Sequence, residues 1–284
     1  MPWFPELFSA RYVAELSQHR RSPLVAVPFF DGVTSGEVDA LVGSFAGEPE
    51  LHHPVRGRVK GRAAFRRFVE MMSEELRAGA CTVEDVDLIV TPHRTVEEVV
   101  LRYDAGQGRV ELPVAIVTER SDAGLHELRM YFSTWPITGS HANRPPLLQP
   151  DEAATEAGVV GDYQRALAAG DVEATVAAFE RDATVREPAG GQYVHRGEQE
   201  LRALFTSFFS NGGGIPLEHC TVTDDGRACA LEYNVVRWGV TDLPPEAGVA
   251  VYVRGESGLL SAARIYDDSN PPPVVRISRG PVRG

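Results

Sequence analysis

The sequence has little lysine and little cysteine. Lys60 is its single lysine, and Cys81, Cys220 and Cys229 are its three cysteines. The cysteines form no CxxC or CxxH pattern, which leaves zinc-binding and dithiol motifs without support and predicts reduced thiols in a cytoplasmic protein. No apolar run reaches the roughly 18 residues that a membrane-spanning helix needs. Prolines and charged residues interrupt the N-terminal stretch, so we do not expect a secretory signal.

Several catalytic motifs are also absent. The sequence contains no G-x-S-x-G, P-loop or Rossmann glycine pattern, so serine hydrolase and nucleotide-binding functions have no support. A formal net charge of −12 argues against nucleic acid and anionic membranes as partners. The chain contains 43% hydrophobic and 24% charged residues, which is typical of a soluble protein. Abundant arginine, alanine, glycine and valine indicate a bacterial gene of high GC content.

The chain contains one segment twice, at an offset of 134 residues. Residues 36–54 reappear as residues 170–188, with six of nineteen positions identical and three more exchanging one acid for another. Two later matches pair Leu101-Arg102-Tyr103-Asp104 with Leu231-Glu232-Tyr233-Asn234 and Arg129-Met130-Tyr131 with Arg264-Ile265-Tyr266. Solenoid repeats have periods of about 20–50 residues, so this longer period indicates a duplicated domain.

The duplication divides the chain into two domains of ordinary size. We expect an N-terminal segment at 1–23, a first domain at 24–137, a linker at 138–155, a second domain at 156–273 and a flexible tail at 274–284. The apolar residues between Trp3 and Leu16 have helical spacing. The linker is rich in glycine and proline, as is the basic tail.

In the second copy, the apolar periodicity changes from helical to strand-like along the chain. We expect helices at 159–168, 172–179 and 198–209, with Asp171 capping the second one. We expect strands at 183–188, 217–223, 228–238, 249–254 and 259–267. This order predicts an α+β fold of two tandem cone-shaped domains. Each would be a strongly curved antiparallel sheet wrapped around helices and enclosing a cavity.

Two patterns carry a family resemblance: G-D-x-x-A-x-x-x-x-F before a strand, and a closing G-x-L-x-x-x-R-x-Y. In the second copy the matching residues are Gly170, Asp171, Ala174, Phe179, Asp182, Ala183, Pro188, Gly197, Leu201, Gly258, Leu259, Arg264, Tyr266 and Asp268. In the first copy they are Gly36, Glu37, Ala40, Phe45, Pro54, Gly61, Phe65, Gly124, Leu125, Arg129 and Tyr131. The chain resembles the nuclear-transport-factor-2-like superfamily, and within it the SnoaL-like polyketide cyclases and ketosteroid-isomerase relatives.

This superfamily includes isomerases, cyclases, dehydratases, epoxide hydrolases and domains without known catalysis, so the function must be argued from the site. Its members commonly pair through their sheets. The resemblance therefore implies an intramolecular pseudo-dimer, and it leaves a further homo-dimer open.

The resemblance places an acid–base aspartate near the end of the last strand, where this sequence has Asp267 and Asp268. A carboxylate in an apolar cavity has a raised pKa that suits a base. Adjacent strand residues point to opposite faces, so one of the two faces the cavity. We favour Asp268, which shares the face of Tyr266. The first copy has Ser133 at this position, which predicts that the second cavity is the active one. The alternative is that both aspartates are solvated at the strand end.

Glu187, next to Pro188, is the second catalytic candidate, and its counterpart in the first copy is His53. Positions here often border the cavity in the resembling fold, while the alternative is an exposed rim for both. The pair His52-His53 also raises the question of a metal. Neighbouring strand residues point apart and no third ligand is evident, so we expect no metal.

Alternating polar and aromatic residues are the candidates for substrate binding. On one strand, Glu232, Asn234 and Trp238 share a face, and Arg102 stands opposite Glu232 in the repeat alignment. The full set of candidates is Tyr163, Glu232, Asn234, Trp238, Tyr252, Tyr266, His53 and Arg102. The alternatives are a solvated sheet face or a subunit contact for the strand residues, and core packing for the tyrosines.

We therefore predict a cyclase, isomerase or lyase that needs no cofactor and acts on a hydrophobic small molecule in the second cavity. Asp268 is the expected acid–base group, assisted by Glu187 or Tyr163. One alternative is a non-catalytic module for small-molecule binding or assembly. Another is an epoxide hydrolase of the limonene or polyether type, in which Asp268, Arg237 and Glu232 would activate water. Strand alternation separates Arg237 from Glu232, which weakens that alternative.

Overall fold

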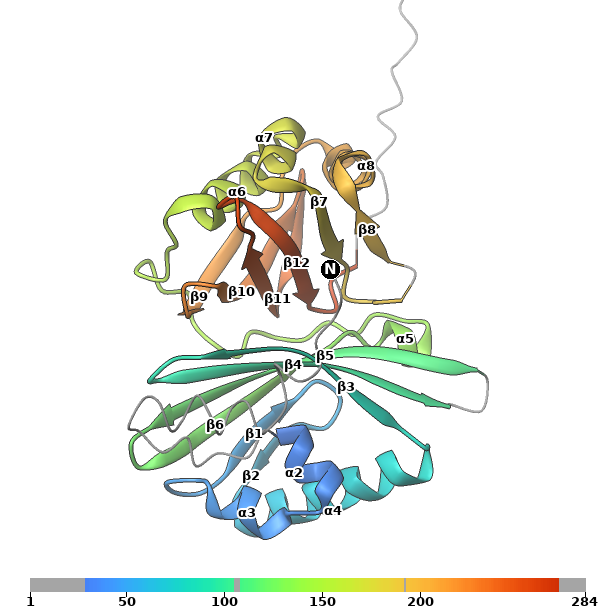
Figure 1. The fold of residues 1–284 in the computed structure, drawn as a ribbon, viewed down its shortest axis with the longest axis vertical. Helices are drawn as coiled ribbons and strands as arrows, with labels where there is room; N and C mark the ends of the chain where they lie inside the picture. The colour runs from blue at the N-terminus through green and yellow to red at the C-terminus, as the bar shows by residue number, and fades with distance from the viewer. Residues whose placement is uncertain (1–28, 105–107, 192, 271–284) are drawn as a thin grey trace, which may run out of the picture.

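The same α+β architecture occurs twice along the chain, with helices first and long strands after them (Figure 1). The computed structural model describes residues 29–104, 108–191 and 193–270. The helix expected between Trp3 and Leu16 and the tail at 274–284 lie outside the described residues. Within the described residues, no helix is long and apolar enough to cross a membrane.

The first domain begins with two short helices and continues into a six-stranded sheet with the strand order β2-β1-β6-β5-β4-β3. Its elements are α2 (Phe29–Ser35), α3 (Val38–Gly43), β1 (Glu50–His53), β2 (Gly57–Lys60), α4 (Arg62–Ala78), β3 (Thr82–Val90), β4 (Arg94–Asp104), β5 (Arg109–Ser121) and β6 (Gly124–Tyr131). The short helix α5 (Trp135–Thr138) follows β6 and begins the connection to the second domain.

The second domain repeats this arrangement with the strand order β8-β7-β12-β11-β10-β9. Its elements are α6 (Gly158–Ala169), α7 (Val172–Ala177), β7 (Phe179–Arg186), β8 (Val194–Arg196), α8 (Gly197–Phe208), the 3-10 helix η2 (Phe209–Asn211), β9 (Leu217–Asp224), β10 (Ala228–Trp238), β11 (Thr241–Arg254) and β12 (Leu260–Tyr266).

Local sequence features explain where the first helices of the second domain end and begin. Gly170 adopts a left-handed φ of 71° and ends α6. Asp171 then caps α7, because its Oδ1 accepts a hydrogen bond from the Ala174 amide at 3.0 Å, as predicted. The predicted strand at 228–238 has the bounds of β10, whereas β11 begins at Thr241, well before the predicted start.

The α+β fold class is confirmed, but each sheet is mixed instead of purely antiparallel. β1 pairs in parallel with β6, and β7 pairs in parallel with β12. These partners are far apart in the sequence and no hairpin turn joins them, so the turn signals did not reveal their direction. The sheets are open, with β2 and β3 at the edges of one and β8 and β9 at the edges of the other.

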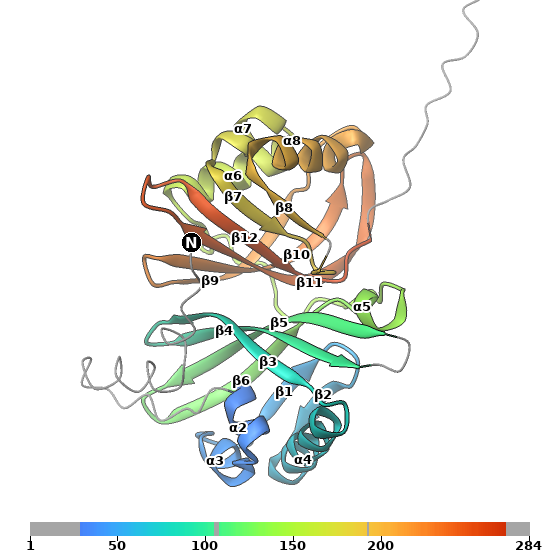
Figure 2. The same ribbon diagram turned by 45° about the vertical axis from the view of Figure 1, so that its right-hand side comes forward.

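The two sheets face each other, and the helices other than α5 lie on the outer sides of the molecule (Figure 1, Figure 2). An apolar layer of buried residues from both domains lies between the sheets: Ile89, Val96, Ala115, Val117, Tyr131, Ala228, Ala230, Ala247, Val249, Val251 and Tyr266. Each sheet therefore has two buried faces. One covers the core of its own domain, and the other contacts the other domain.

Two buried glutamates bind across this layer. Glu232 on β10 accepts hydrogen bonds from Arg129 Nε at 2.6 Å and from the Tyr131 hydroxyl at 2.7 Å. Burial alone would raise the pKa of Glu232. The charge of Arg129 and the hydrogen bonds from Arg129, Thr221 and Tyr131 together outweigh burial, and the pKa lies below its ordinary value. The same bonds recur with the domains exchanged between Glu98, Arg264 and Tyr266. The pairing of the domains is therefore approximately twofold symmetric.

This symmetry corrects the repeat alignment over the middle strands. In each sheet, a glutamate, an aliphatic residue and a tyrosine lie side by side on three neighbouring strands. They are Glu98, Ala115 and Tyr131 in the first domain and Glu232, Val249 and Tyr266 in the second. Glu98, and not Arg102, is therefore the counterpart of Glu232, at the offset of 134 residues that the first segment already has.

Candidate functional site

A cavity of about 210 Å³ lies inside the second domain, between its helices and the inner face of its sheet. Its wall is mostly apolar, with Leu167, Phe208, Ile215, Val235, Trp238 and Ile265 among the lining residues. Trp135 and His141 also line it, although both belong to the connection between the domains. A pocket of this kind suits a small hydrophobic ligand.

A carboxylate and a phenol meet on the cavity wall. The Tyr233 hydroxyl donates a hydrogen bond to Asp267 Oδ2 at 2.8 Å. Gly248 lies across from Tyr233 on β11 and makes room for this pair. A Cβ at position 248 would lie 2.7 Å from Tyr233 Cε2 and 2.8 Å from Asp267 Cβ. Only glycine therefore lets the phenol ring lie this close to the backbone.

Asp267 has the chemistry of a proton-transfer group near neutral pH. Burial raises the pKa of Asp267 to about 6, against the lowering effect of hydrogen bonds from the Tyr233 hydroxyl and the Ser269 amide. The negative charge of Asp268 adds to the increase. Such a carboxylate can both accept and return a proton in this pH range.

Two further phenols line the same space. The Tyr252 hydroxyl accepts a hydrogen bond from Gln164 Nε2 at 2.7 Å, which leaves its own proton for another acceptor. The Tyr163 ring lies 5.2 Å from the Tyr252 ring, measured between centroids. Burial raises the pKa of both phenols, so both are neutral donors at physiological pH. Both residues were predicted from the sequence to bind substrate.

Glu187 also lines the cavity, at its edge. His195 Nε2 lies 2.7 Å from Glu187 Oε1, and both side chains are partly exposed. Glu187, Phe208 and Trp238 also border a second hollow of about 470 Å³ beside α8. The Glu187–His195 pair therefore lies where the two hollows share a wall.

The structure corrects the choice between Asp267 and Asp268. Asp268 does share a face with Tyr266, but the Tyr266 face is turned towards the first domain, and the opposite face borders the cavity. The Asp268 carboxylate accepts hydrogen bonds from Ser133 Oγ at 2.5 Å and from Thr134 Oγ1 at 2.6 Å. Asp268 thus lies outside the cavity wall. Asp267 lies on the wall, where Asp268 was predicted to lie.

Four proposed substrate-binding residues lie outside the cavity as well. Glu232 and Tyr266 belong to the interdomain networks described above. Asn234 donates a hydrogen bond to a carbonyl of the connection between the domains. Arg102 forms ion pairs within the sheet of the first domain. The sheet face chosen for binding is therefore the face that contacts the other domain.

Trp238 reaches the cavity because β10 has a bulge between Val235 and Arg237 that shifts its register. Arg237 itself is exposed. The three residues considered for water activation in an epoxide hydrolase, Asp268, Arg237 and Glu232, lie in three different environments. They do not form a joint site.

The interior of the first domain has apolar side chains where the second has polar ones. Phe29, Val99 and Phe132 are all buried there. At offsets of 134 or 135 residues they correspond to Tyr163, Tyr233 and Asp267. Tyr163, Tyr233 and Asp267 therefore have no polar counterpart in the first copy.

His53, the counterpart of Glu187, is a core residue of the first domain. Its ring packs edge-on against Phe68 and Phe132, and its Nδ1 accepts hydrogen bonds from the amides of Val55 and Arg56, each at 3.1 Å. Burial lowers the pKa of His53 to about 4, so the imidazole is neutral. The side chain lies away from the cavity of the second domain.

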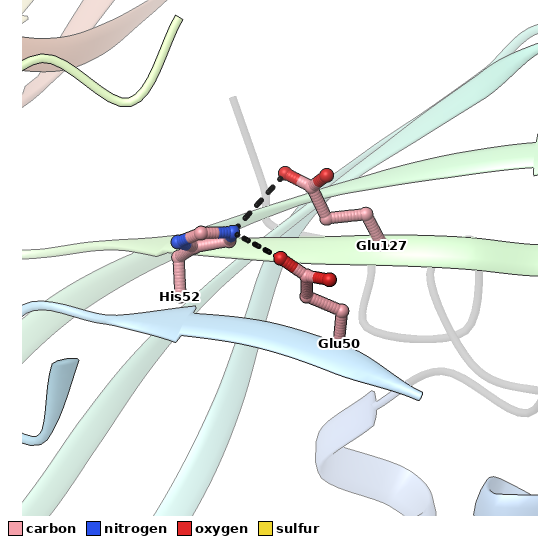
Figure 3. A group of neighbouring side chains, drawn as sticks. All are labelled: Glu50, His52 and Glu127. Atoms are coloured by element: carbon pink, nitrogen blue, oxygen red, sulfur yellow. Dashed lines mark hydrogen bonds and ion pairs between the residues drawn. The ribbon is translucent and has the colours of Figure 1, made fainter. Parts of the chain in front are cut away.

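Two groups of potential metal ligands occur among the described residues, both away from the cavity. In the first, His52 Nε2 lies 3.2 Å from Glu50 Oε1 and 3.6 Å from Glu127 Oε1 (Figure 3). Arg58, Lys60 and Arg129 already pair with these acids. The second group is Glu156, Asp224 and Cys229, in which Arg254 pairs with both acids. The basic neighbours neutralise both groups, which does not favour binding of a divalent cation.

Tyr233, Trp135 and His141 line the cavity but were not among the residues expected from the sequence. A signal for Tyr233 was present, because a glycine inside a strand often marks a close approach of another group, and Gly248 lies inside β11. Trp135 and His141 lie in or next to a stretch that composition marks only as a linker, so their place in the wall has no sequence signal.

Comparison with protein families agrees with this duplicated fold. The model of the SnoaL-like domain family matches residues 26–126 and again residues 160–258. The chain belongs to the SnoaL-like family. The two matched ranges correspond to the two domains of the fold. No curated protein matches the chain.

Three solved structures are examples of proteins similar to a single SnoaL-like domain of this chain. An NTF2-like protein of unknown function from Cytophaga hutchinsonii is 20% identical over 36% of this chain and 91% of its own, with a TM-score of 0.32. A cystatin-fold protein from Novosphingobium aromaticivorans is 20% identical over 38% and 93%, with a TM-score of 0.33. SalBIII, an epoxide hydrolase/cyclase-like enzyme in pyran ring formation in polyether salinomycin, is 19% identical over 40% and 92%, with a TM-score of 0.32.

Proposed function

We propose that the second domain is a cofactor-independent cyclase, isomerase or lyase that acts on a hydrophobic small molecule in its cavity. The observation that carries this proposal is the Asp267–Tyr233 pair, a buried carboxylate with a raised pKa on a mostly apolar wall. The SnoaL-like family includes cyclases and isomerases, which is consistent with such a site.

In the proposed reaction, Asp267 removes a proton from a carbon next to a ligand carbonyl. The electron pair of the C–H bond moves towards the carbonyl oxygen and forms an enolate. A neutral phenol, Tyr252 or Tyr163, donates a hydrogen bond to that oxygen. In an isomerisation, Asp267 returns the proton to a different carbon. In a cyclisation, the enolate carbon attacks the carbon of a second carbonyl, the C=O electron pair moves to its oxygen, and that alkoxide takes the proton from Asp267. Tyr233 orients the carboxylate throughout.

Deuterium uptake by a panel of cyclic ketones headed by 2-tetralone tests this proposal. We expect the protein in D2O to speed the exchange of the acidic α-protons over the buffer rate, as measured by ¹H NMR. Asp267→Asn should lose about 10²–10⁴-fold of this acceleration. The wild-type rate should rise with pH and level off above the Asp267 pKa of about 6, because the base must be deprotonated.

Asp85→Asn is the matched control. Asp85 lies on β3 of the first domain, and burial raises its pKa to about 6 as well. The exchange rate of this variant should equal that of the wild type. Ketones that bind the wild-type cavity without exchanging would support a non-catalytic binding module instead. An Asp267→Asn protein as fast as the wild type would show that Asp267 is not the base.

A further inference from the structure

Two side chains from outside the second domain form part of its cavity wall. Trp135 begins α5, and His141 follows it within the connecting segment, which we define as residues 133–142. The two rings stack, with centroids 4.9 Å apart and an interplanar angle of 23°. Trp135 is 37% exposed, whereas Trp238 in the same wall is 8% exposed. The Trp135 ring therefore lies where the cavity meets solvent.

Asp268 binds both ends of the connecting segment. At the first end, its carboxylate accepts hydrogen bonds from Ser133 Oγ at 2.5 Å, the Thr134 amide at 3.1 Å and Thr134 Oγ1 at 2.6 Å. At the second end, the Ala142 amide donates at 2.7 Å, and His141 Nδ1 lies 3.0 Å away. Asp268 is 5% exposed. One buried carboxylate thus closes the loop that carries the stacked rings.

We propose that Asp268 is a positioning residue that fixes the connecting segment, so that Trp135 and His141 close the cavity over a flat, ring-containing ligand. This inference rests on the ligand cavity of the proposed function, but not on catalysis there. Asp267 and Asp268 follow β12 as neighbours and face opposite sides. One carboxylate contacts the ligand, and the next shapes the entrance.

The ring-containing ligand class follows from the shape of the wall. A stacked indole and imidazole present flat apolar faces, which favour contact with another flat ring. Phe208 and Trp238 add two more rings on the second domain, with centroids 5.3 Å apart. A planar aromatic or conjugated ligand can lie against such faces. A puckered saturated ring with the same carbon skeleton makes fewer contacts with them.

Binding of 2-naphthol and of trans-decahydro-2-naphthol, measured by calorimetry, tests the role of Trp135. We expect Trp135→Ala to weaken 2-naphthol binding about five- to tenfold, and to weaken binding of the saturated analogue about twofold or less. Ile137→Ala is the matched control, because Ile137 lies on the same short helix, is 43% exposed and does not line the cavity. It should leave both affinities unchanged. Equal losses for both ligands in Trp135→Ala would overturn the inference.

The role of Asp268 is tested by combining substitutions. Asp268→Asn should cause the same selective loss of 2-naphthol affinity as Trp135→Ala, and the double variant should bind no more weakly than either single variant. Additive losses, or wild-type selectivity in Asp268→Asn, would overturn the positioning role. If Asp268→Asn shows no cooperative unfolding transition, Ser133→Ala and Thr134→Val each remove one donor to the same carboxylate. They should show a smaller loss with the same selectivity, and unchanged selectivity in both would overturn the role.

Deuterium exchange separates this inference from the proposed function. A selective loss in Trp135→Ala, together with no exchange by the wild type, would uphold the cavity entrance and overturn the enzyme. Exchange that depends on Asp267, together with wild-type selectivity in Trp135→Ala, would uphold the enzyme and overturn the entrance. The two proposals therefore fail independently.

Discussion

The interiors of the two domains differ, while the sheet faces that pack together are alike. On the facing sides, each domain contributes a glutamate to the other's arginine and tyrosine. On the inner side, the second domain has Tyr233, Gly248 and Asp267 where the first has Val99, Val114 and Phe132. One face of the sheet thus maintains the pairing, and the other face carries the polar groups of the proposed site.

We expect the largest effect from Gly248→Val, which gives the second domain the residue that the first domain has at this position, Val114. The new side chain would collide with Tyr233 and Asp267. We expect the free energy of unfolding to fall by about 1–3 kcal/mol, measured by urea denaturation, and ketone exchange to fall with the loss of the Tyr233–Asp267 hydrogen bond.

The double variant Tyr233→Val/Gly248→Val copies both valines and removes one of the two groups that collide with the new side chain. It should lose less stability than the sum of the losses in the two single variants, without recovering exchange. Losses that simply add in the double variant would contradict the steric explanation.

Glu246 is a second difference between the two interiors, and it should make the stability of the second domain depend on pH. It is buried where the first domain has Leu112, and among the described residues its Oε1 has no hydrogen-bond partner. Burial, together with the charges of Asp267 and Asp268, raises the pKa of Glu246 to about 8. The folded protein therefore holds this proton more tightly than the unfolded chain does. The resulting stabilisation is complete at low pH and is lost as the pH rises through 8.

Glu246→Gln should therefore be more stable than the wild type at pH 9, by about 1–3 kcal/mol, and nearly equal to it at pH 4. Urea denaturation across this pH range measures the difference. Glu256→Gln, at an exposed glutamate of the same domain, serves as the control and should follow the wild type throughout. A constant difference between Glu246→Gln and the wild type at all pH values would argue against titration of Glu246.

We expect the smallest effect on stability at the N-termini of the two corresponding helices, α7 and α3. Asp171 caps α7 through its side chain, whereas Glu37 makes no side-chain cap at α3. Asp171→Ala should lower the free energy of unfolding by about 1 kcal/mol, and Glu37→Ala should leave it nearly unchanged. Equal losses in the two variants, measured by urea denaturation, would contradict the role of the Asp171 cap.

The fold could be predicted from the sequence because its signals are local. The switch from helical to alternating periodicity located the elements of the second domain, and Asp171 marked a helix start. The parallel pairing of β7 with β12 had no such signal, since it joins segments far apart in the chain. The bonds of Glu232 to Arg129 likewise span 103 residues.

The site could be predicted only in part, because β10 is buried along most of its length. A strand between two buried layers shows no contrast between a wet face and a dry one. Glu232 and Tyr233 were therefore equally plausible cavity residues, and the same holds for Asp267 and Asp268. Only the position of the other domain decides which face borders the cavity and which face contacts that domain. Tyr163 lies on α6 and Glu187 follows β7, so neither depends on the choice between two buried strand faces, whereas Tyr252 lies on the inner face of β11.

In a symmetric dimer of separate chains, every substitution appears on both subunits at once. Here the crosswise bonds of Glu98 and Glu232 form within one polypeptide, so each half always meets its partner at the effective concentration set by the stretch of chain between β6 and α6. Dilution does not separate the halves. A difference such as Phe132 in one half and Asp267 in the other can then exist within one molecule, so one interior is apolar where the other has a carboxylate. Gene fusion thus lets the two halves specialise without loss of their shared interface.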